Sequence, residues 1–281
     1  MRNRRTLFLI GVSALLIMGF QNCGGGMAFS QGAANASSQS STGPSGGGSG
    51  GVTSGGGGSN PSGSCTPQTT TENLRIIFMV DDSGSTATTD PNQYYRVTVL
   101  KNFLADYSSK ANFSYNFGWF SDSSVEWDTK SSSFVSSPVS PMGNANDLSN
   151  ALTAFEAIGP QSGTNYKTAF SGIEAVIGNV AQVGDGWNYI VVFMSDGQPG
   201  DLGSTAASEL SGSKTLADNL NSYVTAFGSK STLSTVYFGA ESDSNSIANL
   251  SGMASEGGGQ FVDTNKVTDL SISDIITIPC N

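Results

Sequence analysis

The stretch RIIFMVDDSGST, residues 75–86, decides the fold, because a buried strand ends in it among oxygen-bearing side chains. Residues 74–80 are apolar at every position but one, and such a run is typical of a strand that is covered on both faces of a parallel sheet. Asp81, Ser83 and Ser85 follow at alternate positions. These residue types cap helices well, and they also bind hard cations. The stretch therefore predicts either a plain strand-to-helix turn or a metal site.

Strand and helix patterns alternate along the rest of the chain. Apolar residues recur at helical spacing in stretches that begin at Leu100, Leu148, Phe170, Leu216, Ile247 and Val267. Strand patterns stand at residues 113–119, 187–194, 232–239 and 258–264, and a hairpin-like stretch stands at 125–135. This alternation predicts a doubly wound α/β fold, with a mostly parallel central sheet flanked by helices. The last helix, 267–276, has the weakest pattern.

Composition excludes several classes of function. The chain of 281 residues carries 22 Asp and Glu against 12 Lys and Arg, a net charge of −10, which disfavours a nucleic-acid-binding protein. The sequence has no histidine, which removes Ser-His-Asp catalysis and imidazole zinc sites. Phosphatases that use a strand-terminal aspartate need a second aspartate two positions later, where Ser83 stands. We therefore expect a binding protein and not an enzyme.

The N-terminus has the pattern of a targeting segment. Arginines within the first five residues precede the apolar run 7–20, which is shorter than the roughly 20 residues of a membrane-spanning helix. The run is followed by Cys23, and it resembles the lipobox of bacterial lipoproteins, with larger residues where small ones are usual. We expect residues 1–22 to be a signal peptide of the lipoprotein type and Cys23 to be lipidated. Ordinary signal-peptidase cleavage nearby is the alternative.

A flexible tether is expected between the anchor and a folded domain. Residues 24–64 hold no charged side chain and are rich in Gly and Ser, so the segment 23–64 cannot bury enough apolar surface to fold. The domain then spans 65–281. Cys65 and Cys280 bracket it and are candidates for a disulfide in an oxidising compartment, with two free thiols as the alternative.

Three separate segments carry the candidate ligands, and each follows a predicted strand or opens a predicted helix. They are residues 81–85, Gly163-Thr164-Asn165 and Ser195-Asp196-Gly197. Each alone favours a cap or a turn, but the carboxyl ends of parallel strands meet at one edge of a sheet. The oxygen ligands expected there are those of Asp81, Ser83, Ser85, Thr164 and Asp196. Oxygen ligands without nitrogen or sulfur favour a hard divalent cation such as Mg²⁺.

In these segments the chain resembles the von Willebrand factor type A (VWA) domain, and the resemblance covers about residues 74–276. In that family the three segments form a metal-ion-dependent adhesion site (MIDAS) of two aspartates, two hydroxyls and a threonine. The resemblance implies bound Mg²⁺ or Mn²⁺, with an open position that an acidic side chain of a protein partner completes. Ser195 replaces a frequent threonine, and Thr86 a frequent methionine, without loss of a ligand. Asn165 and Tyr166 are candidates for the ligand rim, although for Tyr166 we favour surface packing.

Together these features predict an outer-membrane lipoprotein, on the cell surface or the periplasmic face, that is attached to the membrane by its N-terminal lipid alone. Gly24 after Cys23 favours the outer membrane, because the usual inner-membrane retention signal is an aspartate. The head is expected to bind a protein ligand through its divalent metal. The alternative is a structural scaffold of the cell envelope, whose partners dock independently of the metal.

Overall fold

The computed structural model describes residues 64–65, 70–203, 205–276 and 278–279. The expected signal peptide, the lipidation site Cys23, Cys280, the side chain of Cys65 and nearly all of the tether lie outside the described residues. The lipid anchor, the tether and the disulfide therefore stay predictions. Within the described ranges, no helix combines the length and apolarity that a membrane span needs.

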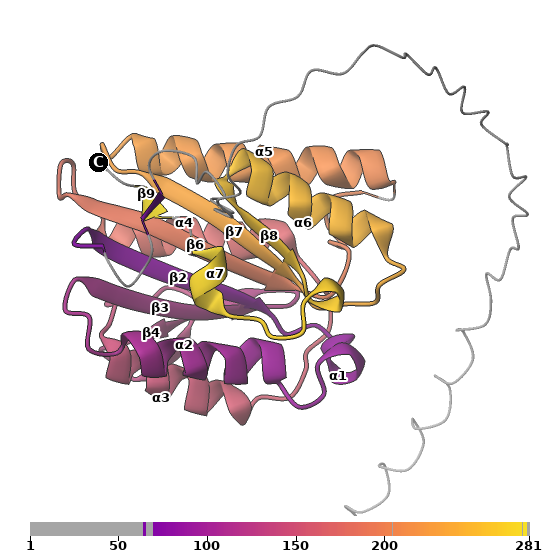
Figure 1. Ribbon diagram of the computed structural model, residues 1–281, viewed down its shortest axis with the longest axis horizontal. Helices are drawn as coiled ribbons and strands as arrows, with labels where there is room; N and C mark the ends of the chain where they lie inside the picture. The colour runs from indigo at the N-terminus through magenta and orange to yellow at the C-terminus, as the bar shows by residue number, and fades with distance from the viewer. Residues whose placement is uncertain (1–63, 66–69, 204, 277, 280–281) are drawn as a thin grey trace, which may run out of the picture. The chain divides into compact units, whose positions relative to one another are not determined.

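A seven-stranded sheet forms the centre of the fold, in the order β5-β4-β3-β2-β6-β7-β8 (Figure 1). Its strands are β2 Asn73–Asp81, β3 Phe113–Phe120, β4 Ser124–Asp128, β5 Ser133–Val135, β6 Trp187–Ser195, β7 Ser231–Tyr237 and β8 Gly258–Asp263. The five strands β3-β2-β6-β7-β8, in this spatial order, run parallel to one another. Strands β4 and β5 extend the sheet beyond β3 as the predicted antiparallel hairpin. This order confirms the doubly wound, mostly parallel α/β class.

Helices cover both faces of the sheet (Figure 1). One face is covered by α2 Val99–Tyr107, α3 Ala145–Glu156 and α7 Ile272–Ile275. The other is covered by α4 Tyr166–Val180, α5 Ala206–Thr225 and α6 Ser244–Glu256. The remaining short elements are α1 Thr86–Thr89, the π-helical turn η1 Tyr94–Thr98 and the 3₁₀ turn η2 Thr264–Lys266.

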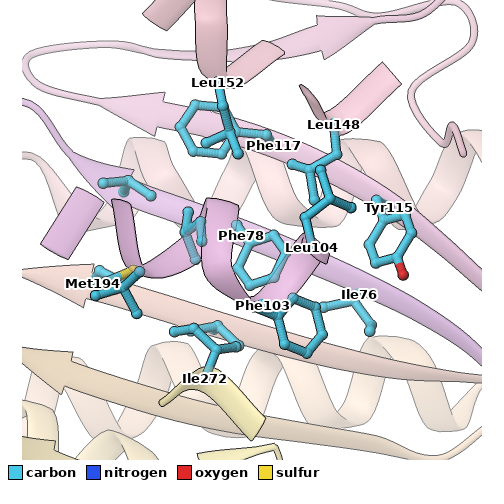
Figure 2. Packing of buried hydrophobic residues seen from close by; sticks show 14 of the residues in the cluster. Ile76, Phe78, Phe103, Leu104, Tyr115, Phe117, Leu148, Leu152, Met194 and Ile272 are labelled. Atoms are coloured by element: carbon cyan, nitrogen blue, oxygen red, sulfur yellow. The ribbon is translucent and has the colours of Figure 1, made fainter. Parts of the chain in front are cut away.

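Strand β2 lies between the two helix layers, and its side chains alternate between them. Ile76 and Phe78 belong to the core under α2 and α3, whereas Ile77 and Met79 belong to the core under α4. Figure 2 shows Phe78 beside Phe103 of α2, and their ring centroids lie 5.9 Å apart. This burial on both sides explains why the strand is apolar without alternation.

The C-terminal end differs from the expectation. The predicted helix 267–276 is too long, because α7 covers only Ile272–Ile275. Val267 is exposed, and the buried residues of this segment are confined to its end, so it lacks an apolar stripe that could hold a longer helix on the core. A second small sheet, which no sequence pattern predicted, pairs β1 Ser64–Cys65 antiparallel with β9 Ile278–Pro279.

Candidate metal centre

The candidate centre lies where the winding of the sheet reverses. The chain passes from β2 to β3 on one side and later to β6 on the other, so β2 and β6 are neighbours. They run parallel, and Val80 pairs with Met194. Asp81 and Ser195 therefore leave the sheet side by side, and Asp196 follows. Ligand sites of open α/β sheets lie at such switch points, beyond the carboxyl ends of the strands.

Asp81 is held through both of its carboxylate oxygens. Ser195 Oγ donates a hydrogen bond to Asp81 Oδ2 at 2.6 Å. The backbone N–H of Ser83 donates to Asp81 Oδ1 at 2.8 Å. The Asp81 side chain is fully buried. It therefore joins the first and third ligand segments from the inside of the fold.

The hydroxyls of the first segment reach Asp196 of the third. Ser85 Oγ donates to Asp196 Oδ1 at 2.9 Å, and the hydroxyl oxygens of Ser83 and Ser85 lie 3.0 Å apart. Thr89 Oγ1 donates to Asp196 Oδ2. The structure thus connects four of the predicted ligands, Asp81, Ser83, Ser85 and Asp196, in one cluster of hydrogen bonds.

Backbone hydrogen bonds join the loop that carries the second segment to the first segment and to the residues that follow the third. The N–H of Gly200 donates to the carbonyl of Thr164 at 2.8 Å, and the N–H of Gln161 donates to the carbonyl of Asp82 at 2.7 Å. Thr164, the fifth predicted ligand, is therefore brought to the same edge of the sheet as the other four.

Helix α4 begins next to the centre, and a residue from the loop that follows the third segment fixes its first turn. Asp201 accepts hydrogen bonds from the N–H of Tyr166 at 3.1 Å and from the N–H of Lys167 at 2.8 Å. Backbone N–H groups at the start of a helix have no partner inside the helix, and a carboxylate satisfies them well. Asp201 therefore ties the loop after the third segment to the start of α4, directly behind the second segment.

The two rim candidates take different places. Asn165 caps α4, because its side chain accepts a hydrogen bond from the N–H of Thr168 at 2.9 Å. Tyr166 is 0% exposed, so both its place on the rim and its packing at the surface were wrong. Its ring packs on Phe193 at 4.8 Å between centroids, and its hydroxyl donates to the carbonyl of Gly197 at 3.1 Å. Tyr166 is the first residue of α4, and its ring lies against the sheet. Its hydroxyl helps to hold the backbone of the third segment at Gly197.

Burial and crowding act on the charge state of the carboxyl groups. Burial and the nearby Asp196 carboxylate raise the pKa of Asp81 to about 7. Burial also raises the pKa of Asp196, against the effect of the hydroxyls that donate to it. Burial raises the pKa of Asp82 to about 6, although the Arg96 guanidinium opposes this rise. A divalent cation offsets the electrostatic cost of buried carboxylates that lie close together.

The available donors fit a hard divalent cation. Within the described part of the chain, no three His, Cys, Asp or Glu side chains gather into a metal-binding group, so the centre must rely on hydroxyls beside its two carboxylates. Oxygen ligands of this kind suit Mg²⁺ and Mn²⁺. Gly84 and Ser85 are exposed while Asp81 is buried, so the cluster opens to solvent at the first segment.

Several residues of the centre were not singled out as ligands or supports from the sequence. Ser195 and Thr89 donate to the two carboxylates, and Asp201 fixes the start of α4. Ser195 had a signal, because it stands in the third segment. Thr89 and Asp201 had none, because each acts on a residue that is distant in the sequence.

Comparisons with known proteins found structural likeness only. The sequence matches no family model and no curated protein. One similar structure is a von Willebrand factor type A protein from Catenulispora acidiphila, with a TM-score of 0.46 and 11% identity over 69% of this chain and 39% of that chain. Another is an aerotolerance-related membrane protein from Bacteroides fragilis, with a TM-score of 0.46 and 14% identity over 72% of this chain and 93% of that chain. A third is the PilB minor pilin from Streptococcus sanguinis, with a TM-score of 0.44 and 14% identity over 72% of this chain and 57% of that chain. The chain thus spans less than two thirds of two of these three proteins.

Proposed function

We propose that this chain is a lipoprotein whose VWA-type head binds Mg²⁺ or Mn²⁺ and, through the metal, an acidic side chain of a protein partner. The metal ligands are Asp81, Ser83, Ser85, Thr164 and Asp196. One observation carries the proposal: the hydroxyl of Ser85 donates to Asp196, 111 positions away, so the first and third segments share one oxygen cluster. A pure helix cap would not need this contact, because a capping side chain bonds to backbone N–H groups of its own helix.

The buried and exposed ligands have different tasks in this proposal. Asp81 and Asp196 are buried and supply negative charge from within the fold, while Ser85 stands at the exposed side. Neutral hydroxyls compensate little of a bound cation's charge, which leaves it attractive to one further carboxylate. A partner's acidic side chain would therefore approach past Gly84 and Ser85. The sequence has no histidine that could serve as a general base there, which favours binding over hydrolysis.

The same proposal includes attachment of the domain to the cell envelope. Cys23 carries the lipid, residues 23–64 form the tether, and the protein lies at the outer membrane, on its surface or its periplasmic face. Cys65 and Cys280 form a disulfide that closes the domain. The backbone pairing of Cys65 with Ile278 supports this disulfide, because it brings the two ends of the domain together.

The test is titration calorimetry of the full chain with Mg²⁺ and with Mn²⁺. Asp196→Ala and Thr164→Ala should lose binding, whereas the exposed control variants Asp218→Ala and Thr153→Ala should bind like the wild type. An absence of heat from the wild-type chain with either metal would contradict the proposal. Partner capture that survives both EDTA and Asp196→Ala would instead favour the metal-independent scaffold.

A further inference from the structure

The loop that carries the hydroxyls of the candidate centre begins and ends with a buried aspartate. Asp82 and Asp90 are both buried, and Ser83, Ser85 and Thr89 lie between them. The backbone of Asp82 is fixed on its own side, because its N–H donates to the carbonyl of Phe120 at 2.8 Å. The position of the hydroxyls therefore depends on what holds the two aspartates with respect to each other.

A single guanidinium holds both. Arg96 Nη1 donates to Asp82 Oδ1 at 2.5 Å, and Arg96 Nε donates to Asp90 Oδ2 at 3.2 Å. Arg96 Nη2 also donates to the backbone carbonyl of Asp90 at 3.2 Å. Arginine suits this task because its donors diverge from one rigid plane.

Arg96 is itself held in place. It is 1% exposed, and its backbone N–H donates to Asp90 Oδ2 at 3.2 Å. Its guanidinium lies over the ring of Phe155 of α3, 5.8 Å from the centroid. Asp90 also accepts from the N–H of Tyr94 at 2.7 Å, which fixes the start of η1. Arg96 and the two aspartates that it holds, Asp82 and Asp90, form a clamp. This clamp connects the loop to α3 in the helix layer behind it.

We propose that Arg96 is a positioning residue for the metal centre: by clamping Asp82 to Asp90 it sets the spacing of the hydroxyls that bind the cation. This inference rests on the proposed metal site. Arg96 touches none of the five proposed ligands through a hydrogen bond, and its target Asp82 is not one of them. Its action on the metal runs through the shape of the loop.

The direction in which metal affinity changes when Arg96 is removed distinguishes a positioning role from a purely electrostatic one. A buried positive charge near the centre repels a second cation, so if Arg96 acted by charge alone, its removal would tighten metal binding. If Arg96 positions the loop, its removal weakens binding in spite of the lost repulsion. Supporting residues of metal sites typically contribute roughly 10- to 100-fold in affinity.

The experiment measures Mn²⁺ and Mg²⁺ affinity of the full chain by titration calorimetry, with circular dichroism to confirm folding. Arg96→Met removes the clamp, and the double variant Arg96→Met/Asp82→Asn removes it while leaving only Asp90, which keeps its three backbone N–H donors, without an ion-pair partner. Arg96→Lys keeps the charge but not the fork. The matched control is Arg75→Met, which removes the Arg75–Asp185 pair of 2.8 Å at the opposite end of β2.

We expect roughly 10- to 100-fold weaker binding in the double variant and in Arg96→Lys, and unchanged affinity in Arg75→Met. Wild-type affinity or tighter binding in the folded double variant would overturn the positioning role. Equal weakening by Arg75→Met would overturn it too, because the effect would then be general destabilisation. If the wild type binds neither metal, the proposed function itself fails, and this result is distinct from both.

Discussion

Ser195 Oγ lies 2.6 Å from Asp81 Oδ2 and donates a hydrogen bond to it, although 114 positions separate the two residues. Both leave the sheet at the carboxyl ends of neighbouring parallel strands. The contact shows that the fold itself, before any metal is considered, brings the first and third segments into one polar cluster in the interior.

Replacing Ser195 by alanine should lower the free energy of unfolding by about 1–3 kcal/mol, because Asp81 Oδ2 loses its buried donor. Urea unfolding in EDTA measures this without a contribution from bound metal. Ser195→Thr should keep most of the stability. Ser133→Ala, at an exposed hydroxyl, should change it by less than about 0.5 kcal/mol. A Ser195→Ala protein as stable as the wild type would show that this contact contributes nothing.

Asp201→Ala should weaken Mg²⁺ binding roughly tenfold, because the start of α4, next to Thr164, loses its link to the loop after the third segment. The loss of two hydrogen bonds at the helix start should also reduce stability by about 1 kcal/mol. Titration calorimetry and urea unfolding separate the two effects. Asp218→Ala, on the exposed side of α5, serves as the control, and the prediction is wrong if both variants bind Mg²⁺ equally well.

Glu126 of β4 should make the protein less stable as the pH rises. Its side chain is 0% exposed, and neither carboxylate oxygen has a hydrogen-bond partner among the described residues. Burial raises its pKa from 4.5 to about 7, although the nearby Ser124 hydroxyl opposes the rise. The folded protein thus keeps a proton that the unfolded chain releases, so stability falls between pH 4.5 and about 7, by about 3 kcal/mol in total.

Glu126→Gln removes this titration and should flatten the pH dependence by that amount. Urea unfolding at several pH values from 4 to 8 measures the difference between the two proteins, which cancels the contributions of other groups. Glu156→Gln, at an exposed position, should leave the dependence unchanged. Parallel curves for wild type and Glu126→Gln would contradict the prediction.

Gly172 of α4 should not tolerate alanine, because it packs against the buried Glu126 side chain. Alanine normally stabilises a helix interior by about 1 kcal/mol relative to glycine. Here an added Cβ would stand 1.9 Å from Glu126 Oε1 and 2.6 Å from Ser124 Oγ. We expect Gly172→Ala to destabilise the wild type and to be less destabilising in a Glu126→Ala background, where only the close contact with Ser124 Oγ remains. Thermal unfolding of the four proteins gives the coupling, and additive effects would exclude the predicted clash.

The sequence predicted those parts of the fold that depend on local patterns. The apolar run of β2 and the alternation of elements identified the sheet, and the 81–85 segment identified the edge at which the candidate centre lies. The burial of Tyr166 was not predictable, because a tyrosine after a helix cap looks the same whether its ring turns inward or outward. Arg96 and Asp201 were missed because each makes its decisive contact with a different loop. The length of α7 was overestimated because apolar residues stand before it in the sequence, although Val267 is exposed and Leu270 is only partly buried.

The direction of β2 has a mechanical consequence. The strand begins at Asn73, where the chain enters the sheet, and ends at Asp81, beside the candidate centre. It is paired in parallel with β3 over residues 74–81 and with β6 over residues 73–80. A pull between the entering chain and a partner gripped at the other end would run along this strand, and it would have to shear both ladders at once instead of peeling them bond by bond. Under a pulling force the domain should therefore unfold only at high force and in a single step.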